Sequence, residues 1–122
     1  MKLSKESEKG IAQLQALEQN LQQFLAQRQN FQMQQLEIEN ALKELETTKE
    51  TPFKVVGNIM VATSKDALKE ELTSKKEVVE MRIKSIESQE EKIREKADAL
   101  QKSIVKELQK EEGDHGKRAG DH

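Results

Sequence analysis

Two histidines, each preceded by an aspartate, are the residues whose types most readily suggest metal chemistry. They form the dipeptides Asp114-His115 and Asp121-His122 near the end of the sequence. Imidazole nitrogens and carboxylate oxygens are common ligands of divalent metals. The surrounding glycines indicate a flexible tail, which would give such ligands none of the outer hydrogen bonds that orient them. We therefore expect no metal site and no other cofactor.

Adjacent carboxylates at Glu70-Glu71 and Glu90-Glu91 have the residue type needed for general acid–base chemistry. That chemistry requires a pocket that shifts the pKa of one group. Both pairs instead lie in long, highly charged segments with helical spacing, where carboxylates are normally solvated. The chain also has no cysteine, no nucleophile beside a recognisable base and no glycine-rich phosphate loop. We expect that it is not an enzyme.

The composition of the 122 residues leaves little material for a globular interior. Hydrophobic residues make up 34% and charged residues 36% of the chain, whereas ordinary globular domains carry roughly 25% charged residues. Acidic and basic residues are intermixed, so no basic face for nucleic acid is evident. There is no signal-peptide h-region and no apolar run of the roughly 20 residues that a membrane span needs. We expect a soluble, cytoplasmic protein that binds neither nucleic acid nor membrane.

The elements that must position any functional residue are two long segments with heptad-like spacing. In residues 1–48, alternating steps of three and four residues connect Leu14, Leu17, Leu21, Phe24, Arg28, Phe31, Gln35, Ile38, Leu42 and Leu45. Most of these side chains are large and apolar, whereas the residues between them are mainly polar. An average step of 3.5 residues is typical of helices that pack in a left-handed coiled coil.

A second stripe with the same spacing follows in residues 64–110. Its positions are Leu72, Lys76, Val79, Ile83, Ile86, Glu90, Ile93, Ala97, Leu100 and Ile104. If the two segments lie antiparallel, both stripes align in one register, with Leu45 opposite Leu72. Arg28 then falls opposite Glu90, and we predict a contact between them that fixes the register. The alternative is that both side chains reach out to water.

A short β-prone stretch, residues 53–62, separates the two segments. It is rich in Val, Ile and Phe around Gly57-Asn58, where glycine suits a type II′ turn and asparagine tolerates the type I′ alternative. Neither face of such a hairpin is polar, and a lone hairpin is marginally stable and offers unpaired edges to other chains. The alternative is a hairpin folded down onto Leu45 and Leu68. We expect assembly with other subunits through Phe53, Val55, Val56, Gly57, Asn58, Ile59, Met60 and Val61.

This layout resembles the β-class subunits of the prefoldin family. The most specific parts are the turn Val56-Gly57-Asn58-Ile59 and the helix start at Lys65-Asp66, within a resemblance that covers about residues 1–110. A single hairpin, where an α-class subunit has two, places the chain in the β class. The resemblance implies a mainly α fold, a long antiparallel two-helix coiled coil whose one β-hairpin joins an inter-subunit β-barrel platform. It also implies a hexamer of two α-class and four β-class subunits.

The resemblance further implies an ATP-independent chaperone that holds unfolded client proteins at the coiled-coil tips and delivers them to a group II chaperonin. The residues favour the same region, because helix ends fray readily and loosely paired apolar groups amid charge suit binding to many partners. We expect client binding at Leu3, Ile11, Leu14, Leu17, Leu100, Ile104, Val105 and Leu108. The alternative is that these are ordinary residues of the seam between the helices.

The sequence thus predicts a helix over residues 1–48, an assembly hairpin over 53–62, a helix over 64–110 and a flexible tail over 111–122. Thr63 or Ser64 is the expected cap of the second helix, with Asp66 in its first turn. A few apolar residues near the hairpin lie off the stripes, and we expect some of them to pack against a neighbouring subunit or to line the cavity below the platform: Leu25, Met33, Leu36, Val78 and Met81. The alternative function is a structural scaffold whose hairpin is only a dimerisation element.

Overall fold

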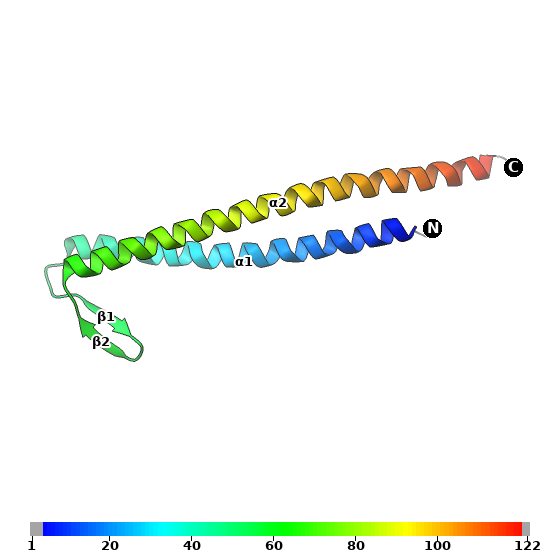
Figure 1. The fold of residues 1–122 in the computed structure, drawn as a ribbon. Helices are drawn as coiled ribbons and strands as arrows, with labels where there is room; N and C mark the ends of the chain where they lie inside the picture. Colours follow the sequence, from blue (N-terminus) through cyan, green and yellow to red (C-terminus); the bar gives the residue numbers. More distant parts are fainter. Residues whose placement is uncertain (1–3, 121–122) are drawn as a thin grey trace. The chain divides into compact units, whose positions relative to one another are not determined.

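The computed structural model describes residues 4–120, and side chains over residues 4–112. The elements follow in the order α1 (Lys5–Thr47), β1 (Phe53–Val56), β2 (Ile59–Ala62) and α2 (Lys65–Gly120). Figure 1 shows two long helices that are connected through the hairpin at one end, which confirms the predicted combination of elements. The chain divides into two compact units: the hairpin unit, Ala26–Glu87, and the terminal unit, Met1–Leu25 with Ser88–His122.

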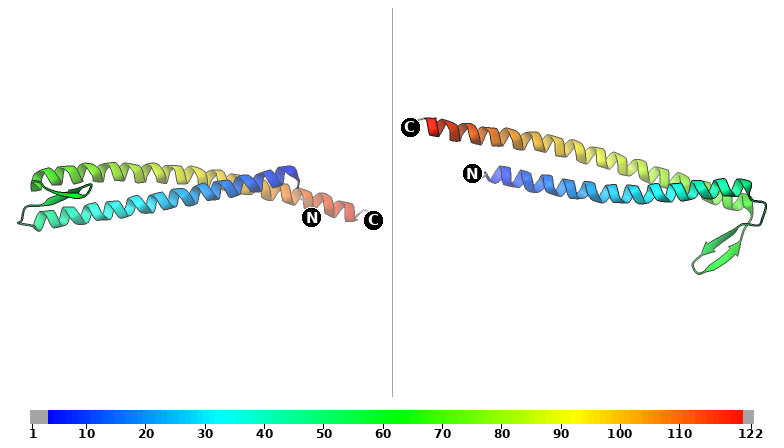
Figure 2. Two further views of the ribbon diagram at one scale, coloured as in Figure 1. Left: turned by 90° about the horizontal axis from the view of Figure 1, so that it is seen from below. Right: turned by 180° about the vertical axis from the view of Figure 1, so that it is seen from behind.

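In the hairpin unit, α1 and α2 run antiparallel and bury the apolar stripe between them (Figure 2). Leu45, Val79, Ile83 and Ile86 are buried, and the remaining stripe positions of this unit are half-buried. At Lys76, where a charge interrupts the stripe, Nζ lies 3.7 Å from Glu39 Oε1 of α1. The charge of Lys76 is therefore paired with a carboxylate of α1. The burial of the apolar positions on both sides of it confirms the predicted stripe.

The terminal unit contains the other ends of both helices, and its stripe is also the less exposed side of each helix. Ile104 is buried, and the predicted positions from Leu14 to Phe24 on α1 and from Ile93 to Leu100 on α2 are half-buried. Gly10 is buried as well, directly against Ile104. The seam of this unit therefore continues past the last position that the apolar spacing identifies.

Serine side chains cap both helices. Ser4 Oγ accepts a hydrogen bond from the backbone N–H of Ser7 (3.1 Å) at the start of α1, and Ser64 Oγ accepts one from the N–H of Ala67 (3.1 Å) at the start of α2. Each bond satisfies an N–H that has no partner within its helix. Ser64 is thus the cap of the second helix, as one of the two predicted candidates.

The hairpin pairs Phe53 with Ala62 and Val56 with Ile59 in an antiparallel register. Gly57 has a φ of 63°, whereas Asn58 has no positive φ. Only the first turn residue of a type II′ turn needs a positive φ, so the turn matches the type that the glycine predicted. The backbone N–H of Thr63 donates to the carbonyl oxygen of Pro52 (3.0 Å), which closes the base of the hairpin.

Helix α2 extends to Gly120, beyond the expected helix end at residue 110. Residues 105–112 consist mainly of Lys, Glu and Gln, which have high helix propensity. Adding a residue to an existing helix is much easier than starting one, so the glycines that follow do not end it. Of the segment expected to be a flexible tail, residues 111–120 belong to α2, and residues 121–122 lie outside the described residues.

Candidate functional site

The hairpin presents the most exposed apolar surface of the hairpin unit. Val55 and Met60, which face each other across the two strands, are 71% and 70% exposed. Every residue from Val55 to Val61 is exposed, so the hairpin is not folded onto the helix bases at Leu45 and Leu68. Within the described residues each strand pairs only with the other, which leaves both outer edges open to strands of another chain. Which of these residues contact another subunit stays a prediction.

Lys54 connects the hairpin to α2 by an ion pair. Its Nζ lies 3.4 Å from Glu71 Oε2 on α2, and Lys75 Nζ lies 3.6 Å from the other oxygen of the same carboxylate. Lys54 shares a face with Val56, Ile59 and Val61, because side chains alternate between the two faces of a strand. Three of the four residues on this face are apolar, and Lys54 adds one charge that Glu71 of α2 neutralises.

A second polar contact ties the hairpin unit together at the base of the hairpin. Lys65 Nζ donates to the backbone carbonyl oxygens of Glu46 (3.2 Å) and Thr48 (3.5 Å). These carbonyls stand at the end of α1, where the last helical residues have no partner within the helix and the dipole favours a cation. The start of α2 therefore stabilises the end of α1. This contact joins the two helix ends between which the hairpin is inserted in the chain.

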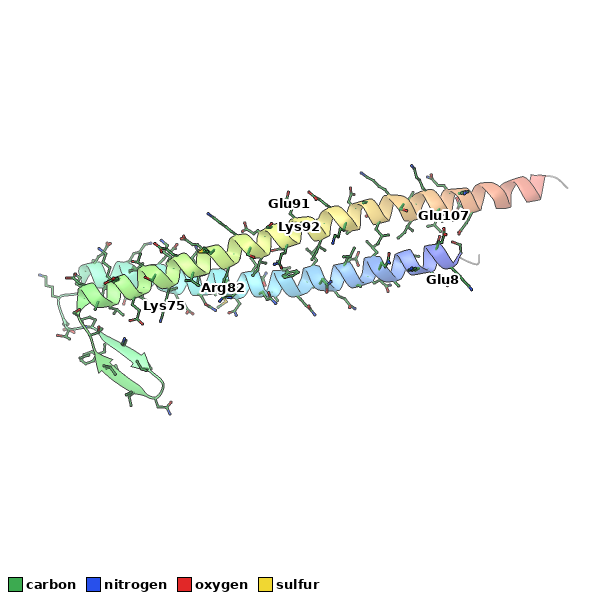
Figure 3. All side chains as sticks on the ribbon, viewed as in Figure 1. Glu8, Lys75, Arg82, Glu91, Lys92 and Glu107 are labelled. Carbon is green, nitrogen blue, oxygen red and sulfur yellow. The ribbon has the colours of Figure 1, made fainter. Side chains whose placement is uncertain are left out.

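Beside the seam of the hairpin unit lies an apolar groove of about 320 Å³. Phe31, Ile38, Val78 and Val79 are among its lining residues, and the Arg82 guanidinium carbon lies 5.8 Å from the centre of the Phe31 ring. Figure 3 labels Arg82 on α2. The distance suits a cation–π contact, so the charge of Arg82 covers part of the aromatic face that the seam leaves open.

Four of the five apolar residues that lie off the stripes are exposed, namely Met33, Leu36, Val78 and Met81. Leu25, in the terminal unit, is half-buried. Single exposed apolar residues are normal on protein surfaces. A role of these residues in contact with a neighbouring subunit stays a prediction.

In the terminal unit, the residues predicted to bind clients differ in accessibility. Val105 is 46% exposed and Ile104 is buried. The half-buried members of the set are Ile11, Leu14, Leu17, Leu100 and Leu108, and Leu3 lies outside the described residues. Most of the predicted client surface is therefore in the seam between the helices, and in this structure Val105 is the most accessible member with a described side chain.

The spacing of apolar residues did not reveal a polar cluster that ends the seam of the terminal unit. Glu111 Oε1 accepts hydrogen bonds from the backbone N–H of Ser4 (3.1 Å) and from Ser7 Oγ (3.3 Å). Ser7 is 1% exposed. Continuing the alternating steps beyond Leu14 reaches Ser7 through Gly10, and continuing them beyond Ile104 reaches Glu111. The continued spacing was therefore a signal for these positions. It was missed because a search for apolar residues at this spacing does not count Gly, Ser or Glu.

These hydrogen bonds also affect the acidity of Glu111. Ser4, and more weakly Ser7, stabilise the charged carboxylate and hold the pKa of Glu111 below its ordinary value, while partial burial acts in the opposite direction. Figure 3 shows Glu107, one helical turn earlier, on the side of α2 that faces α1, whereas Glu91 points away from it. The carboxylates of Glu107 and Glu111 therefore both lie at the end of the seam. The serines are uncharged, so they stabilise a carboxylate by hydrogen bonding without neutralising its charge.

Glu90, the predicted partner of Arg28, is 2% exposed in the terminal unit. Its Oε2 accepts a hydrogen bond from Arg94 Nη2 at 3.4 Å, one helical turn along α2. A buried carboxylate needs such a partner. Arg28 is half-buried in the hairpin unit, and its contact with Glu90 stays a prediction.

Over the described part of the chain, no three His, Asp or Glu side chains gather as metal ligands would. The same residues include no helix that is long and apolar enough to cross a membrane. His115 and its neighbours fall where side chains are not described, and His122 lies outside the described residues. The surfaces that remain are the open hairpin and the end of the terminal seam.

Known proteins are similar to this chain in both sequence and fold. The model of the prefoldin subunit family matches residues 8–111. The chain is 44% identical over 96 residues to prefoldin subunit beta of Archaeoglobus fulgidus, a match that covers 77% of this chain and 83% of that protein. Prefoldin subunit beta of Pyrobaculum aerophilum is 37% identical over 95 residues, covering 76% and 75%. The crystal structure of the prefoldin beta subunit from Thermococcus strain KS-1 aligns with a TM-score of 0.79 at 32% identity, over 84% of this chain and 92% of that one.

Proposed function

This chain belongs to the prefoldin family as a β-type subunit, and on that premise we propose that it is part of an ATP-independent holding chaperone. The chaperone role follows from the family. The holding of non-native proteins and their delivery to a group II chaperonin are the finer parts of the proposal, together with a cytoplasmic location. A pure scaffold, the alternative, would not need a hairpin whose apolar side chains are left exposed.

The observation that carries the proposal is the uncovered hairpin. Burial of a whole Val, Ile or Met side chain contributes about 1.5–3 kcal/mol. The residues from Val55 to Val61 are exposed in the single chain, so most of this free energy becomes available only when another subunit covers them. The open strand edges allow backbone pairing with another hairpin. We propose that four copies of this chain and two α-class subunits close their hairpins into a shared β-barrel platform.

Client holding falls to the terminal unit in this proposal. Exposed Val105 and half-buried Leu108 lie among charged residues of α2, so a client would meet apolar contacts that are individually weak. Several copies in one complex then hold a client together, because the second contact forms at a high effective concentration. Nothing in this mechanism consumes a nucleotide.

The proposal is tested with the complex formed from this chain and an α-class prefoldin subunit. Native mass spectrometry should give six subunits, four of them this chain. The complex should then suppress the light scattering of unfolding citrate synthase without ATP, and raise its refolded yield when a group II chaperonin and ATP are added. A homodimer that leaves citrate synthase aggregation unchanged would favour the scaffold.

A variant of the terminal unit separates holding from assembly. Val105→Ser with Leu108→Ser should keep the six-subunit mass and weaken the suppression of aggregation, because two apolar contacts are lost from every copy of the chain. Ala99→Ser, an exposed change on the same helix, is the matched control. Equal suppression by variant and control would place client binding elsewhere.

A further inference from the structure

The end of the seam in the terminal unit is built from small and polar residues, unlike the apolar stripe that leads to it. The alternating steps pass from Leu14 to Gly10 and Ser7 on α1, and from Ile104 to Glu107 and Glu111 on α2. All four of these continuation residues are buried or half-buried. The helices thus stay together at positions whose own side chains offer little apolar surface, so a polar interaction can contribute there.

A chain of hydrogen bonds supplies that interaction. Ser4 Oγ donates to Ser7 Oγ at 3.1 Å, and Ser7 Oγ donates to Glu111 Oε1 at 3.3 Å. The backbone N–H of Ser4 donates to the same carboxylate oxygen at 3.1 Å. The hydrogen bonds to Glu111 join α2 to the start of α1, and a charged acceptor makes such bonds stronger than neutral ones. We call Ser4, Ser7 and Glu111 the polar clasp.

Gly10 brings the helices close enough for the clasp to form. A Cβ atom at this position would lie 2.9 Å from Ile104 Cγ1 and 3.2 Å from Ile104 Cδ1. Real Cβ atoms essentially never show a contact under 3.0 Å, so a side chain at Gly10 would require either the Ile104 side chain or α2 to shift. Glycine at this position lowers the helix propensity of α1, but it allows Ile104 to pack closely against the α1 backbone.

The clasp is not an optimised closure. Glu111 Oε2 is shielded from solvent and has no hydrogen-bond partner among the described residues. A buried acceptor without a partner costs free energy, which opposes the bonds made by Oε1. A contact with such opposing contributions can open without a large change in the stability of the whole chain.

We propose that the polar clasp holds the end of the seam shut, and that a non-native client binds by displacing it. Opening would release Leu100, Ile104 and Leu14, which the closed seam covers, as an apolar surface for an extended apolar segment of the client. Closed seam and client then compete for the same side chains, so the clasp sets the affinity for clients. This inference rests on the proposed holding function and adds Ser7, Gly10 and Glu111 as positioning residues.

A reversible lock tests the inference in the complex with the α-class subunit. The Gly10 Cβ position lies 2.9 Å from Ile104 Cγ1. One further bond of about 1.5 Å puts the two Cβ atoms within roughly 4.4 Å, inside the range of about 3.5–4.5 Å for disulfides. The chain has no other cysteine, so Gly10→Cys with Ile104→Cys can form only this bridge within one chain.

With the bridge formed, as verified by mass, the complex should lose most of its suppression of citrate synthase aggregation, and reduction should restore it. The oxidised and reduced forms have the same sequence, so the loss of Ile104 affects both equally. The cysteine-free parent with and without reductant controls for the reductant itself. Equal suppression by the oxidised and reduced forms overturns the inference.

The opposite change is Ser7→Ala with Glu111→Ala, which removes the clasp. Suppression should then need about three- to tenfold less complex, because hydrogen bonds to a charged group shift an equilibrium by about tenfold or more, and the unpaired Glu111 Oε2 offsets part of that shift. Glu112→Ala, an exposed neighbour, is the matched control. An unchanged or higher requirement overturns the inference. If the parent complex itself fails to suppress aggregation, the proposed holding function is wrong. If the parent suppresses aggregation but the clasp variants behave as it does, only the inference about the clasp is wrong.

Discussion

Replacing Val55 and Met60 by serine should separate the folding of this chain from its assembly. The two side chains face each other across the hairpin and are 71% and 70% exposed. Because they make few contacts within the chain, the double variant should keep the helices and the free energy of unfolding of the isolated chain. In the assembled complex the same two side chains would be covered by a neighbouring hairpin.

The expected magnitude follows from the surface that assembly covers. Full burial of a Val or Met side chain contributes about 1.5–3 kcal/mol. Since about 70% of each side chain remains to be covered, the pair should contribute about 2–4 kcal/mol to the contact of each hairpin. At about 1.4 kcal/mol per tenfold, association should weaken by about 30- to 1,000-fold.

Sedimentation velocity of mixtures with an α-class subunit, over a range of concentrations, measures this effect directly. Val105→Ser is the matched control, because Val105 is exposed in the terminal unit and should leave the assembly unchanged. Assembly of the double variant at the concentrations of the parent chain would refute the reasoning. The hairpin would then not be the apolar contact between subunits.

Three further predictions concern the turn, the seam and the clasp. Gly57→Ala should weaken assembly about tenfold, because a φ of 63° costs an L-residue about 1–2 kcal/mol; sedimentation of the variant beside Asn58→Gly measures this. Ile83→Ala should lower the free energy of unfolding in urea by about 2–4 kcal/mol, the usual cost of truncating a buried Ile. Because its folded pKa is lowered, Glu111 stabilises the closed seam above its unfolded pKa of about 4.3 and loses this effect as the pH falls through the folded value. Carboxyl NMR titration should show that lowered midpoint, and a higher one in Ser7→Ala.

The helical seam and the hairpin could be predicted because each depends on a local, repeated signal. The stripe from Leu14 to Leu45 and its counterpart on α2 contain no exposed position, since an apolar spacing of 3.5 residues can be satisfied only by a partner helix. Gly57 predicted the turn because few other residues adopt a positive φ at low cost. The hairpin register then followed from the turn.

Three features could not be predicted in this way, because two depend on polar contacts and one depends on helix propagation. Ser7 and Glu111 are 104 residues apart in the sequence, and neither residue type by itself indicates contact with another helix. The pairing of Lys54 with Glu71 connects the hairpin to α2, although each residue alone looks like ordinary surface charge. The extension of α2 past residue 110 reflects helix propagation, which overrides the local preference of glycine.

The exposed hairpin has a consequence for a copy of this chain that has not yet met its partners. Such a copy displays a run of apolar side chains and open strand edges, the same features by which an incompletely folded protein is recognised. A newly made subunit would therefore be a client of the completed complex until its hairpin is covered. Production of the two kinds of subunit in matched amounts would then protect the chaperone from occupation by its own parts.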